Sequence, residues 1–296
     1  MEIDADTRLV TLIGHPVEHT LSPRIHNTAF RAQGVNALYV ATPVRPEALE
    51  AAIEGLRALQ FLGANVTIPH KQAVLPLLDT VTERARAVGA VNTIVGQVED
   101  DDDGAASGRP PLLRGDNTDV EGFLEPLEEH PGATDLEGAD MLIFGAGGAA
   151  RAVAYGLLHR YEPDQLTLVA RRPDQADALA RDLADYDEGD AFRVCMFDDA
   201  RPAVRSSRLL VNATPLGMHP EPEATPWSDP DDFGRDQIAY DLIYNPRRTR
   251  FLRDAGRRGA ATVGGMEMLV AQAAAAYAQW TGQSFPTDAV TDAVVS

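Results

Sequence analysis

Short apolar runs alternate with longer amphipathic stretches along the first third of this chain. The apolar runs, each with the amphipathic stretch that follows it, are 8–14 and 22–34, 37–44 and 46–60, and 63–69 and 71–89. This alternation is typical of strands and crossover helices in an α/β domain. Ser22 and Pro23 predict an N-cap with proline at the first helical position, and Gly34 predicts the end of that helix.

A second α/β series follows, with different motifs and no repeat of fixed period. It runs through the segments 139–161, 165–172, 191–197, 209–217 and 237–244, after which comes an alanine-rich apolar helix at 266–280. We expect a domain boundary near Asp119. Residues 1–118 and 265–296 would then form one α/β domain and residues 119–264 the other, with the C-terminal helices returning to the first domain.

The second series begins with the segment MLIFGAGGAAR (141–151), a hydrophobic strand that leads into a glycine turn and a helix. Gly145 permits the tight turn, Gly147 lets the backbone approach a pyrophosphate, and Ala150 is small enough for close helix packing. A plain tight turn is the alternative interpretation. The strand before it and the helix after it favour a Rossmann-type domain, whose dinucleotide would contact Gly145, Ala146, Gly147, Gly148 and Ala149.

The next predicted strand ends with Ala170, Arg171 and Arg172. An NAD site usually has an acidic residue at this point for the ribose 2′-hydroxyl. Two guanidinium groups instead favour the 2′-phosphate of NADP, by charge and by bidentate geometry. Asp174 comes after Pro173 and is predicted to be an early helix residue. The alternative is that the two arginines are solvated surface residues.

Composition and charge limit the partners. The net charge is −19, the pI is about 4.6 and no long Lys/Arg run occurs, which argues against nucleic acid and anionic membranes. The acidic tract EDDDDG (99–104), in a predicted surface loop at 98–111, indicates a salt-adapted cytoplasmic protein as a hypothesis. Cys195 is the only cysteine, so neither a disulfide framework nor a cysteine zinc site is expected. The chain has no signal peptide pattern and no run of 18 apolar residues.

Lys71, in the segment NVTIPHK (65–71), is the only lysine, and every other cationic side chain is arginine. An amine can exchange a proton when its surroundings permit, whereas guanidinium stays protonated. A nicotinamide enzyme needs a group that handles the proton on the reacting oxygen. Asp116 and Asp119 lie at a predicted strand-to-helix junction, and one of them beside Lys71 would complete such a pair. The alternative for Lys71 is that the lysine was retained by chance. The alternative for the two aspartates is that one is an N-cap and the other a turn residue.

One apparent metal motif is misleading. The segment HPVEH (15–19) matches a zinc peptidase pattern whose ligands must share a helix face. Gly14 and Pro16 place these histidines in a turn, and the remaining histidines have no ligand spacing, so no metal site is expected.

Eight motifs occur in an order that resembles the shikimate dehydrogenase family. They are GHPVEHTLSPRIHN (14–27), NVTIPHK, GAVNT (89–93), GDNTD (115–119), GAGGAAR, NATPLGM (212–218), YDLIYNPRRT (240–249) and EMLVAQA (267–273). The resemblance implies NADPH-dependent reduction of 3-dehydroshikimate to shikimate, a small-molecule substrate, and a monomer or homodimer in the cytoplasm.

The resemblance also implies roles for individual residues. Lys71 and Asp119 would be the catalytic pair. The implied substrate-binding residues are Thr20, Ser22, Asn65, Thr67, Asn92, Tyr244 and Gln272. The implied cofactor-binding residues, besides those of the glycine turn, are Arg151, Ala170, Arg171, Arg172, Thr214, Gly265 and Met268. Two departures affect substrate and cofactor preference: Thr20 stands where many members have serine, and Glu267 where glycine is frequent.

Three other functions compete with this interpretation. A quinate/shikimate dehydrogenase using NAD is opposed by Arg171 and Arg172. A catalytically silent dinucleotide-sensing protein is opposed by the intact Lys71 and Asp119, because a sensor needs no proton-transfer group. A tetrahydrofolate-linked dehydrogenase of similar architecture would have a different sequence around the lysine.

Overall fold

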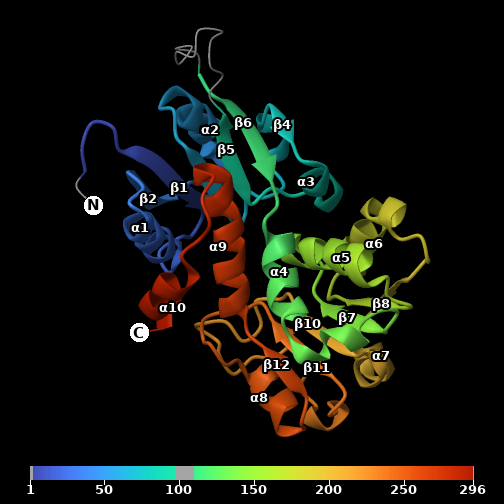
Figure 1. Cartoon of the computed structure of the whole chain (residues 1–296). Coiled ribbons are helices and arrows are strands. Elements are labelled where there is room, and N and C mark those ends of the chain that lie inside the picture. Colours follow the sequence, from blue (N-terminus) through green and yellow to red (C-terminus); the bar gives the residue numbers. More distant parts are fainter. Residues whose placement is uncertain (1–2, 98–109, 296) are drawn as a thin grey trace. The chain divides into compact units, whose positions relative to one another are not determined.

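The computed structural model describes residues 3–97 and 110–295 of the chain, which forms two compact units (Figure 1). Unit 1 consists of Met1–Thr118 and Gln272–Ser296, and unit 2 of Asp119–Ala271. The acidic tract at 99–104, and all of the predicted surface loop except Pro110 and Pro111, lie outside the described residues.

Unit 1 contains a mixed six-stranded sheet in the order β2-β1-β3-β5-β6-β4. The strands are β1 (Arg8–Gly14), β2 (Ala37–Pro43), β3 (Gly63–Val66), β4 (Thr80–Val81), β5 (Thr93–Gln97) and β6 (Leu112–Asp116). β1 pairs in parallel with both β2 and β3, whereas β5 is antiparallel to β3 and β6. The three apolar runs predicted as strands near the N-terminus are therefore confirmed.

Helices cover this sheet. In unit 1 they are α1 (Ser22–Gln33), α2 (Leu49–Ala58), α3 (Glu83–Val88), α10 (Thr287–Val295) and the C-terminal part of α9 (Gly265–Thr281). Gly34 ends α1, as predicted, and the structure shows it in the left-handed conformation with φ of 66°. The predicted N-cap was wrong by one residue. Leu21 is the N-cap and Ser22 begins the helix, because the Ser22 side chain bonds to the Thr20 hydroxyl and caps no amide.

The amphipathic stretch at 71–89 does not form one crossover helix. Only Glu83–Val88 is α-helical, after a short 3-10 turn at Leu75–Leu77 and the strand β4. Pro76 lacks the N–H that a continuous helix would need. The Asp79 carboxylate, moreover, accepts the amide of Leu113 at 2.7 Å, which holds this segment beside β6.

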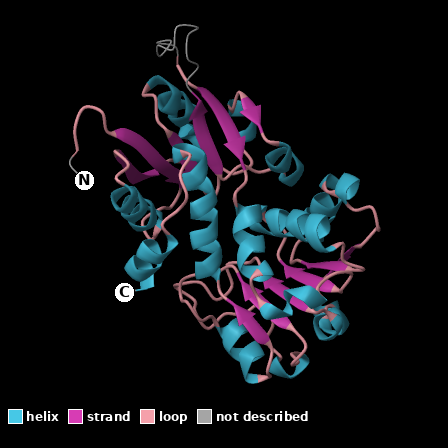
Figure 2. Ribbon diagram, viewed as in Figure 1, coloured by secondary structure: helices cyan, strands magenta, loops and turns pink. Residues whose placement is uncertain are grey.

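Unit 2 contains a six-stranded sheet, entirely parallel, in the order β12-β11-β10-β7-β8-β9 (Figure 2). Its strands are β7 (Met141–Phe144), β8 (Leu166–Val169), β9 (Phe192–Cys195), β10 (Leu209–Asn212), β11 (Ile238–Asp241) and β12 (Ala261–Val263). This is the strand order of a doubly wound dinucleotide-binding fold, with its topological switch point between β7 and β10. The Rossmann-type prediction is confirmed.

The helices of unit 2 are α4 (Asp119–Glu128), α5 (Gly148–Tyr161), α6 (Pro173–Asp182), α7 (Arg201–Ser206), α8 (Arg250–Arg257) and the N-terminal part of α9. Leu142 and Phe144 of β7 share a core cluster with α7 and α8. Met141 and Ile143 point to the opposite face, because side chains alternate along a strand. A four-residue strand that is completely buried on both faces is the pattern of a parallel sheet covered by helices.

The C-terminal helices return to unit 1, as the sequence predicts. The Trp280 indole of α9 donates a hydrogen bond to the Ile94 carbonyl of β5 at 2.9 Å. The first residues of α9 belong to unit 2 instead, since a Cβ on Gly265 would lie only 2.4 Å from the Leu242 carbonyl oxygen. Unit 2 extends to Ala271, seven residues beyond position 264, the expected end of the second domain.

Candidate active site

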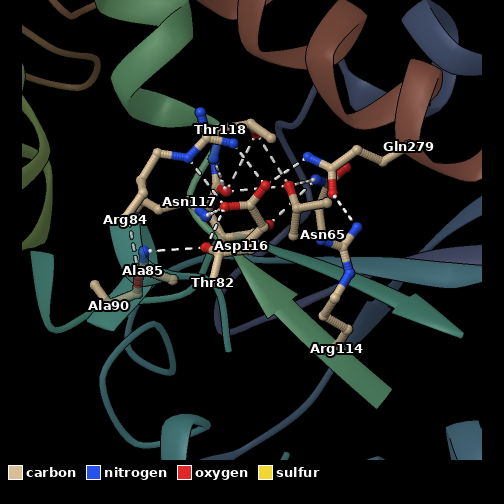
Figure 3. A network of polar contacts seen from close by, with 12 residues as sticks. Asn65, Thr82, Arg84, Ala85, Ala90, Arg114, Asp116, Asn117, Thr118 and Gln279 are labelled. Carbon is tan, nitrogen blue, oxygen red and sulfur yellow. Dashed lines mark hydrogen bonds and ion pairs between the residues drawn. The ribbon is translucent and has the colours of Figure 1, made fainter. Parts of the chain in front are cut away.

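A buried carboxylate at the end of β6 organises one face of unit 1 (Figure 3). Asp116 is 2% exposed and accepts hydrogen bonds from the Thr82 hydroxyl at 2.6 Å and from the Gln279 amide at 2.7 Å. Arg84 donates to both carboxylate oxygens, at 3.0 and 2.6 Å. Burial alone would raise the pKa of Asp116, but hydrogen bonds from Arg84 and Thr82, with the Arg84 charge, bring it below its ordinary value. Of the two candidate aspartates, Asp116 thus serves as a structural anchor.

The anchor fixes the chain that leads into Asp119. The Asn117 amide N–H donates to Asp116, and the Asn117 side chain donates to the Ala90 carbonyl at 2.8 Å. The Thr118 N–H donates to Asn92 Oδ1 at 2.7 Å. Asp119 follows as the first residue of α4, 6% exposed. The position of Asp119 is therefore set by main-chain bonds on both preceding residues.

The segment that carries Lys71 is tied to the sheet of unit 1 at several points. The Thr67 N–H donates to the Ile13 carbonyl at 2.9 Å, and the buried His70 ring bonds to the Val44 carbonyl at 2.6 Å. The Lys71 carbonyl accepts the Val91 N–H at 2.7 Å. Lys71 itself is half-buried, and its main chain is bonded to the residue directly before Asn92.

Two of the predicted substrate residues, Asn65 and Asn92, are linked to each other. Asn65, 5% exposed, donates to the Asn92 carbonyl and to the Thr93 hydroxyl, both at 3.2 Å. Its side-chain oxygen accepts the Tyr39 hydroxyl at 2.7 Å. The orientation of the Asn65 amide is thus defined at both ends.

Thr20 and Ser22 are also brought together. The Thr20 hydroxyl donates to the Ser22 hydroxyl at 3.1 Å and accepts the Ser22 N–H at 3.2 Å. This places two hydroxyl groups side by side at the N-terminus of α1. The predicted residue Gln272 lies on α9, half-buried, seven residues before Gln279.

In unit 2 the glycine turn has the form that the sequence predicts. Gly145 has φ of +111°, and a Cβ there would lie 3.1 Å from the Ala213 carbonyl oxygen, so only glycine suits the position. Gly147 caps the N-terminus of α5 and is exposed, with nothing within 4 Å of where its Cβ would be. Gly148, Ala149 and Ala146 are half-buried beside it. The result is an open helix N-terminus with room for an anion.

The arginines around this turn have different environments. Ala170 is buried, and Arg171 and Arg172 that follow β8 are exposed, without an ion pair to any described residue. Asp174 lies in the first turn of α6, as predicted. Arg151 on α5 is instead 8% exposed and paired with Asp182 at 2.5 Å. The Arg151 guanidinium is thus anchored by a partner on α6.

Scanned against family models, the chain matches the shikimate dehydrogenase substrate binding domain over residues 12–94 and the shikimate 5'-dehydrogenase C-terminal domain over residues 265–295. It is 65% identical to shikimate dehydrogenase (NADP(+)) of Salinibacter ruber over 99% of each chain. The chain belongs to the shikimate dehydrogenase family.

Solved structures of this family superpose over nearly the whole chain. A shikimate dehydrogenase in complex with NADP+ matches with a TM-score of 0.87 and 36% identity, covering 99% of this chain and 96% of the other. Quinate dehydrogenase from Corynebacterium glutamicum in complex with NAD matches with a TM-score of 0.84 and 30% identity, covering 98% of this chain and 99% of the other. The family fold thus serves more than one cofactor and more than one substrate.

Three further predicted residues lie where β10 and β11 lead into loops or where α9 begins. The Thr214 hydroxyl donates to Asn212 Oδ1 at 2.7 Å. Tyr244 is half-buried, and burial raises its pKa. Met268 is 7% exposed in the second turn of α9, whereas Glu267, one of the departures from the family pattern, is exposed.

Sequence reasoning missed one buried acid of unit 2. Asp241, at the end of β11, accepts hydrogen bonds from Asn212 Nδ2 at 3.1 Å, from the Ile243 N–H at 3.0 Å and from the Thr249 hydroxyl at 2.5 Å. Burial raises the pKa of Asp241 to about 6 against these bonds. Asp241 and Thr249 both belong to the motif YDLIYNPRRT, which was the available signal.

The part of the chain that the structure describes contains no group of three or more His, Cys, Asp and Glu side chains that could hold a metal ion. His15 and His19 lie in the non-helical segment between β1 and α1. Within 3–97 and 110–295, moreover, no helix combines the length and the apolar character needed to cross a membrane.

Proposed function

We propose that this protein catalyses the reversible reduction of 3-dehydroshikimate to shikimate with NADPH. The observation that carries the proposal is the 65% identity to shikimate dehydrogenase (NADP(+)) of Salinibacter ruber over 99% of each chain. Lys71 and Asp119, the residues that the reaction requires by family resemblance, are both present. The reaction consumes one hydride and one proton and forms one alcohol.

Lys71 and Asp119 are proposed as the catalytic pair. NADPH, when bound, supplies the hydride to the ring ketone carbon. Protonated Lys71 gives the oxygen a proton or stabilises the charge that develops on it, and Asp119 orients the amine. In support, the hydrogen bonds of unit 1 link the Lys71 carbonyl to Val91, and Asn92 to Thr118, the residue directly before Asp119.

Substrate binding is proposed for the seven residues that the family resemblance implies. The adjacent hydroxyls of Thr20 and Ser22 would hold the carboxylate of the substrate, as their contact at the N-terminus of α1 allows. Asn65, Thr67, Asn92 and Gln272 would bind ring hydroxyls, and Tyr244 would line the site.

The residues of unit 2 fit a dinucleotide. The open N-terminus of α5 at Gly147 can receive the pyrophosphate, because no atom lies within 4 Å of the missing Cβ. Arg171 and Arg172 would bind the 2′-phosphate of NADP, since both are exposed and form no ion pair within the described chain. Arg151 would also bind a phosphate of the cofactor, and its ion pair with Asp182 holds the guanidinium in place. Thr214, Gly265 and Met268 would lie nearer the nicotinamide.

A second candidate function is quinate oxidation with NAD. It is favoured by the similarity to quinate dehydrogenase from Corynebacterium glutamicum, at 30% identity and a TM-score of 0.84. It is opposed by Arg171 and Arg172 at the end of β8, where an acidic residue would suit NAD better.

Initial-rate kinetics on the purified protein, crossing shikimate and quinate with NADP and NAD, test the proposal. Fast turnover with shikimate and NADP supports both the ring specificity and the role of the two arginines. Preference for quinate and NAD would replace the proposal by the second candidate. Absence of turnover in all four combinations would favour a dinucleotide-sensing protein.

We further propose that the protein is a cytoplasmic monomer or homodimer that acts without nucleic acid or a membrane. Size-exclusion chromatography with light scattering at several protein concentrations tests the oligomeric part.

A further inference from the structure

Two residues of the motif SPRIHN (22–27) converge on one tyrosine of the neighbouring strand, and the proposed function gives a role to neither. Tyr39 lies on β2 and is 1% exposed. His26 and Asn27 of α1 contact its ring and its main chain, and Asn65 of β3 accepts a hydrogen bond from its hydroxyl. A tyrosine that is fixed in three ways has little freedom to reorient, which suggests that its hydroxyl must be presented in one position.

The main chain of Tyr39 is bracketed by a side-chain amide. Asn27 Nδ2 donates to the Tyr39 carbonyl, and Asn27 Oδ1 accepts the Tyr39 N–H, both at 2.8 Å. This pair of bonds takes the place of a neighbouring strand along the outer edge of β2. Asn27 therefore fixes the position of β2 relative to α1 at the height of the Tyr39 ring.

The ring of Tyr39 packs in a cluster with the side chains of His26 and Trp280, whose own ring centroids are 5.1 Å apart. His26 stacks on it at a centroid distance of 4.5 Å and an interplanar angle of 14°, and Trp280 of α9 lies at 6.1 Å. His26 is completely buried, and neither ring nitrogen has a hydrogen-bond partner in the described chain. Burial lowers the pKa of His26 to about 3. At neutral pH His26 is thus an uncharged stacking surface for Tyr39.

The Tyr39 hydroxyl is aimed at a proposed substrate-binding residue. It donates to Asn65 Oδ1 at 2.7 Å, which leaves Asn65 Nδ2 for the Asn92 carbonyl and the Thr93 hydroxyl. Burial raises the pKa of Tyr39. The phenol thus remains protonated and keeps its hydrogen bond to Asn65.

We propose that Tyr39 is a positioning residue for substrate binding, which fixes the Asn65 amide in the orientation that shikimate requires. The inference rests on the proposed function, in which Asn65 contacts a ring hydroxyl of the substrate. That contact is not to the reacting carbon. Loss of the Tyr39 hydroxyl should therefore weaken binding of ground state and transition state alike and raise KM without a matching loss of kcat.

The test is the Tyr39→Phe variant, which keeps the ring and the stack on His26. The KM for shikimate should rise about tenfold, the effect of one buried hydrogen bond to a polar partner, while kcat and the KM for NADP stay within about twofold. Tyr161→Phe is the matched control. Tyr161 is 2% exposed, lies at the end of α5, and has a hydroxyl without a hydrogen-bond partner among the described residues. Its variant should have wild-type constants.

A double-mutant cycle measures the coupling between Tyr39 and Asn65. Asn65→Ala and Tyr39→Phe should raise the KM for shikimate less than multiplicatively when combined, because each removes the same hydrogen bond. The thermal unfolding midpoint should fall more in Tyr39→Phe than in Tyr161→Phe, because only Tyr39→Phe leaves a buried acceptor, Asn65 Oδ1, without its donor. A purely structural role would instead change kcat and both KM values together.

The failures of the two proposals are distinguishable. If the wild-type protein does not turn over shikimate with NADP, the proposed function fails. If the wild type is active but Tyr39→Phe has an unchanged KM for shikimate, or combines multiplicatively with Asn65→Ala, the positioning role is wrong.

Discussion

At the residue scale, the least replaceable side chain is the one lysine of the chain. Its carbonyl is bonded to Val91 and its segment is tied to β1, so the amine is presented from a rigid support. Arginine stands at every other cationic position, so the composition itself singles out Lys71. We attribute the choice to the ability of an amine to exchange a proton from a compact head.

Lys71→Arg should fold normally and lose kcat by about a hundredfold or more, because guanidinium retains the charge but cannot exchange the proton. Steady-state kinetics and a thermal unfolding curve measure the two effects. Lys71→Ala with added alkylamine is the companion experiment, and recovery of activity with a pH profile set by the amine would support proton transfer. Near-wild-type turnover in Lys71→Arg would show that charge alone is sufficient.

Asp241 makes the stability of the folded protein depend on pH. Burial raises its pKa from 3.8 to about 6, so the native state binds this proton more tightly than the unfolded chain does. The stability that this group contributes is fully present below about pH 4 and is lost as the pH rises through about 6.

Asp241→Asn should remove that contribution. The wild type should lose, relative to the variant, on the order of 2 kcal/mol of unfolding free energy between pH 4 and pH 6, and the difference should be constant above pH 7. Chemical denaturation of both proteins at several pH values measures it. Parallel pH curves for the two proteins would contradict the assignment to Asp241.

At the element scale, α9 is the helix whose placement matters most, because it carries both Gln272 and Met268. Gln279 lies seven residues after Gln272, which is two helical turns and the same face. Its amide donates to the buried Asp116 at 2.7 Å, and its carbonyl oxygen accepts Arg114 at 3.2 Å (Figure 3). These two bonds set the rotation and the register of the helix in unit 1.

Gln279→Ala should therefore lower the free energy of unfolding by about 1–3 kcal/mol and raise the KM for shikimate severalfold, since Asp116 loses a buried donor and Gln272 its register. Gln283→Ala is the matched control, because Gln283 is exposed just beyond the helix. Urea denaturation and steady-state kinetics on both variants measure the two effects. Equal behaviour of the two variants would exclude a role of Gln279 in placing α9.

At the scale of the whole molecule, the net charge of −19 is the dominant property. Ion pairs such as Arg84 with Asp116 and Arg151 with Asp182 engage part of the acidic excess. The remaining carboxylates repel one another, which favours the expanded chain at low ionic strength. The hypothesis of salt adaptation follows from this balance.

The thermal unfolding midpoint should rise by about 5 °C or more between roughly 0.1 and 2 M KCl, because salt screens the repulsion between carboxylates. Scanning fluorimetry at constant pH measures it, with an equal osmolality of sucrose as the control for solvent exclusion. A midpoint that is unchanged or lower in KCl would contradict the hypothesis.

Several features could be predicted from the sequence because they depend on local patterns. Four of them are the strand and glycine turn at 141–151, the helix end at Gly34, the helix at 266–280 and the position of Asp174 after Pro173. Hydrophobic periodicity, glycine and proline act within a few residues, so they can be interpreted without knowing the fold. The order of eight motifs identified the family for the same reason.

Tertiary structure decided the rest. Ser22 could serve as an N-cap by its residue type, but its hydroxyl accepts a hydrogen bond from the Thr20 hydroxyl and caps no helix amide. The stretch 71–89 has helical periodicity, but it does not form one helix. Pro76 lacks an N–H, and the hydrogen bond from the Leu113 N–H to Asp79 holds the stretch beside β6. Residue type alone does not distinguish Asp116 from Asp119, whereas the hydrogen bonds from Arg84 and Gln279 make Asp116 the structural anchor.

The sequence by itself determined the fold class, the family and the residue types that the chemistry requires. Only the tertiary structure decided which polar group each of these residues bonds. It brought the rings of His26 and Trp280 into contact with Tyr39, whose hydroxyl bonds to Asn65. The physical reason is range. Secondary structure follows from neighbours along the chain, whereas a hydrogen bond between β2 and β3 or between β6 and α9 joins residues 26 to 163 positions apart.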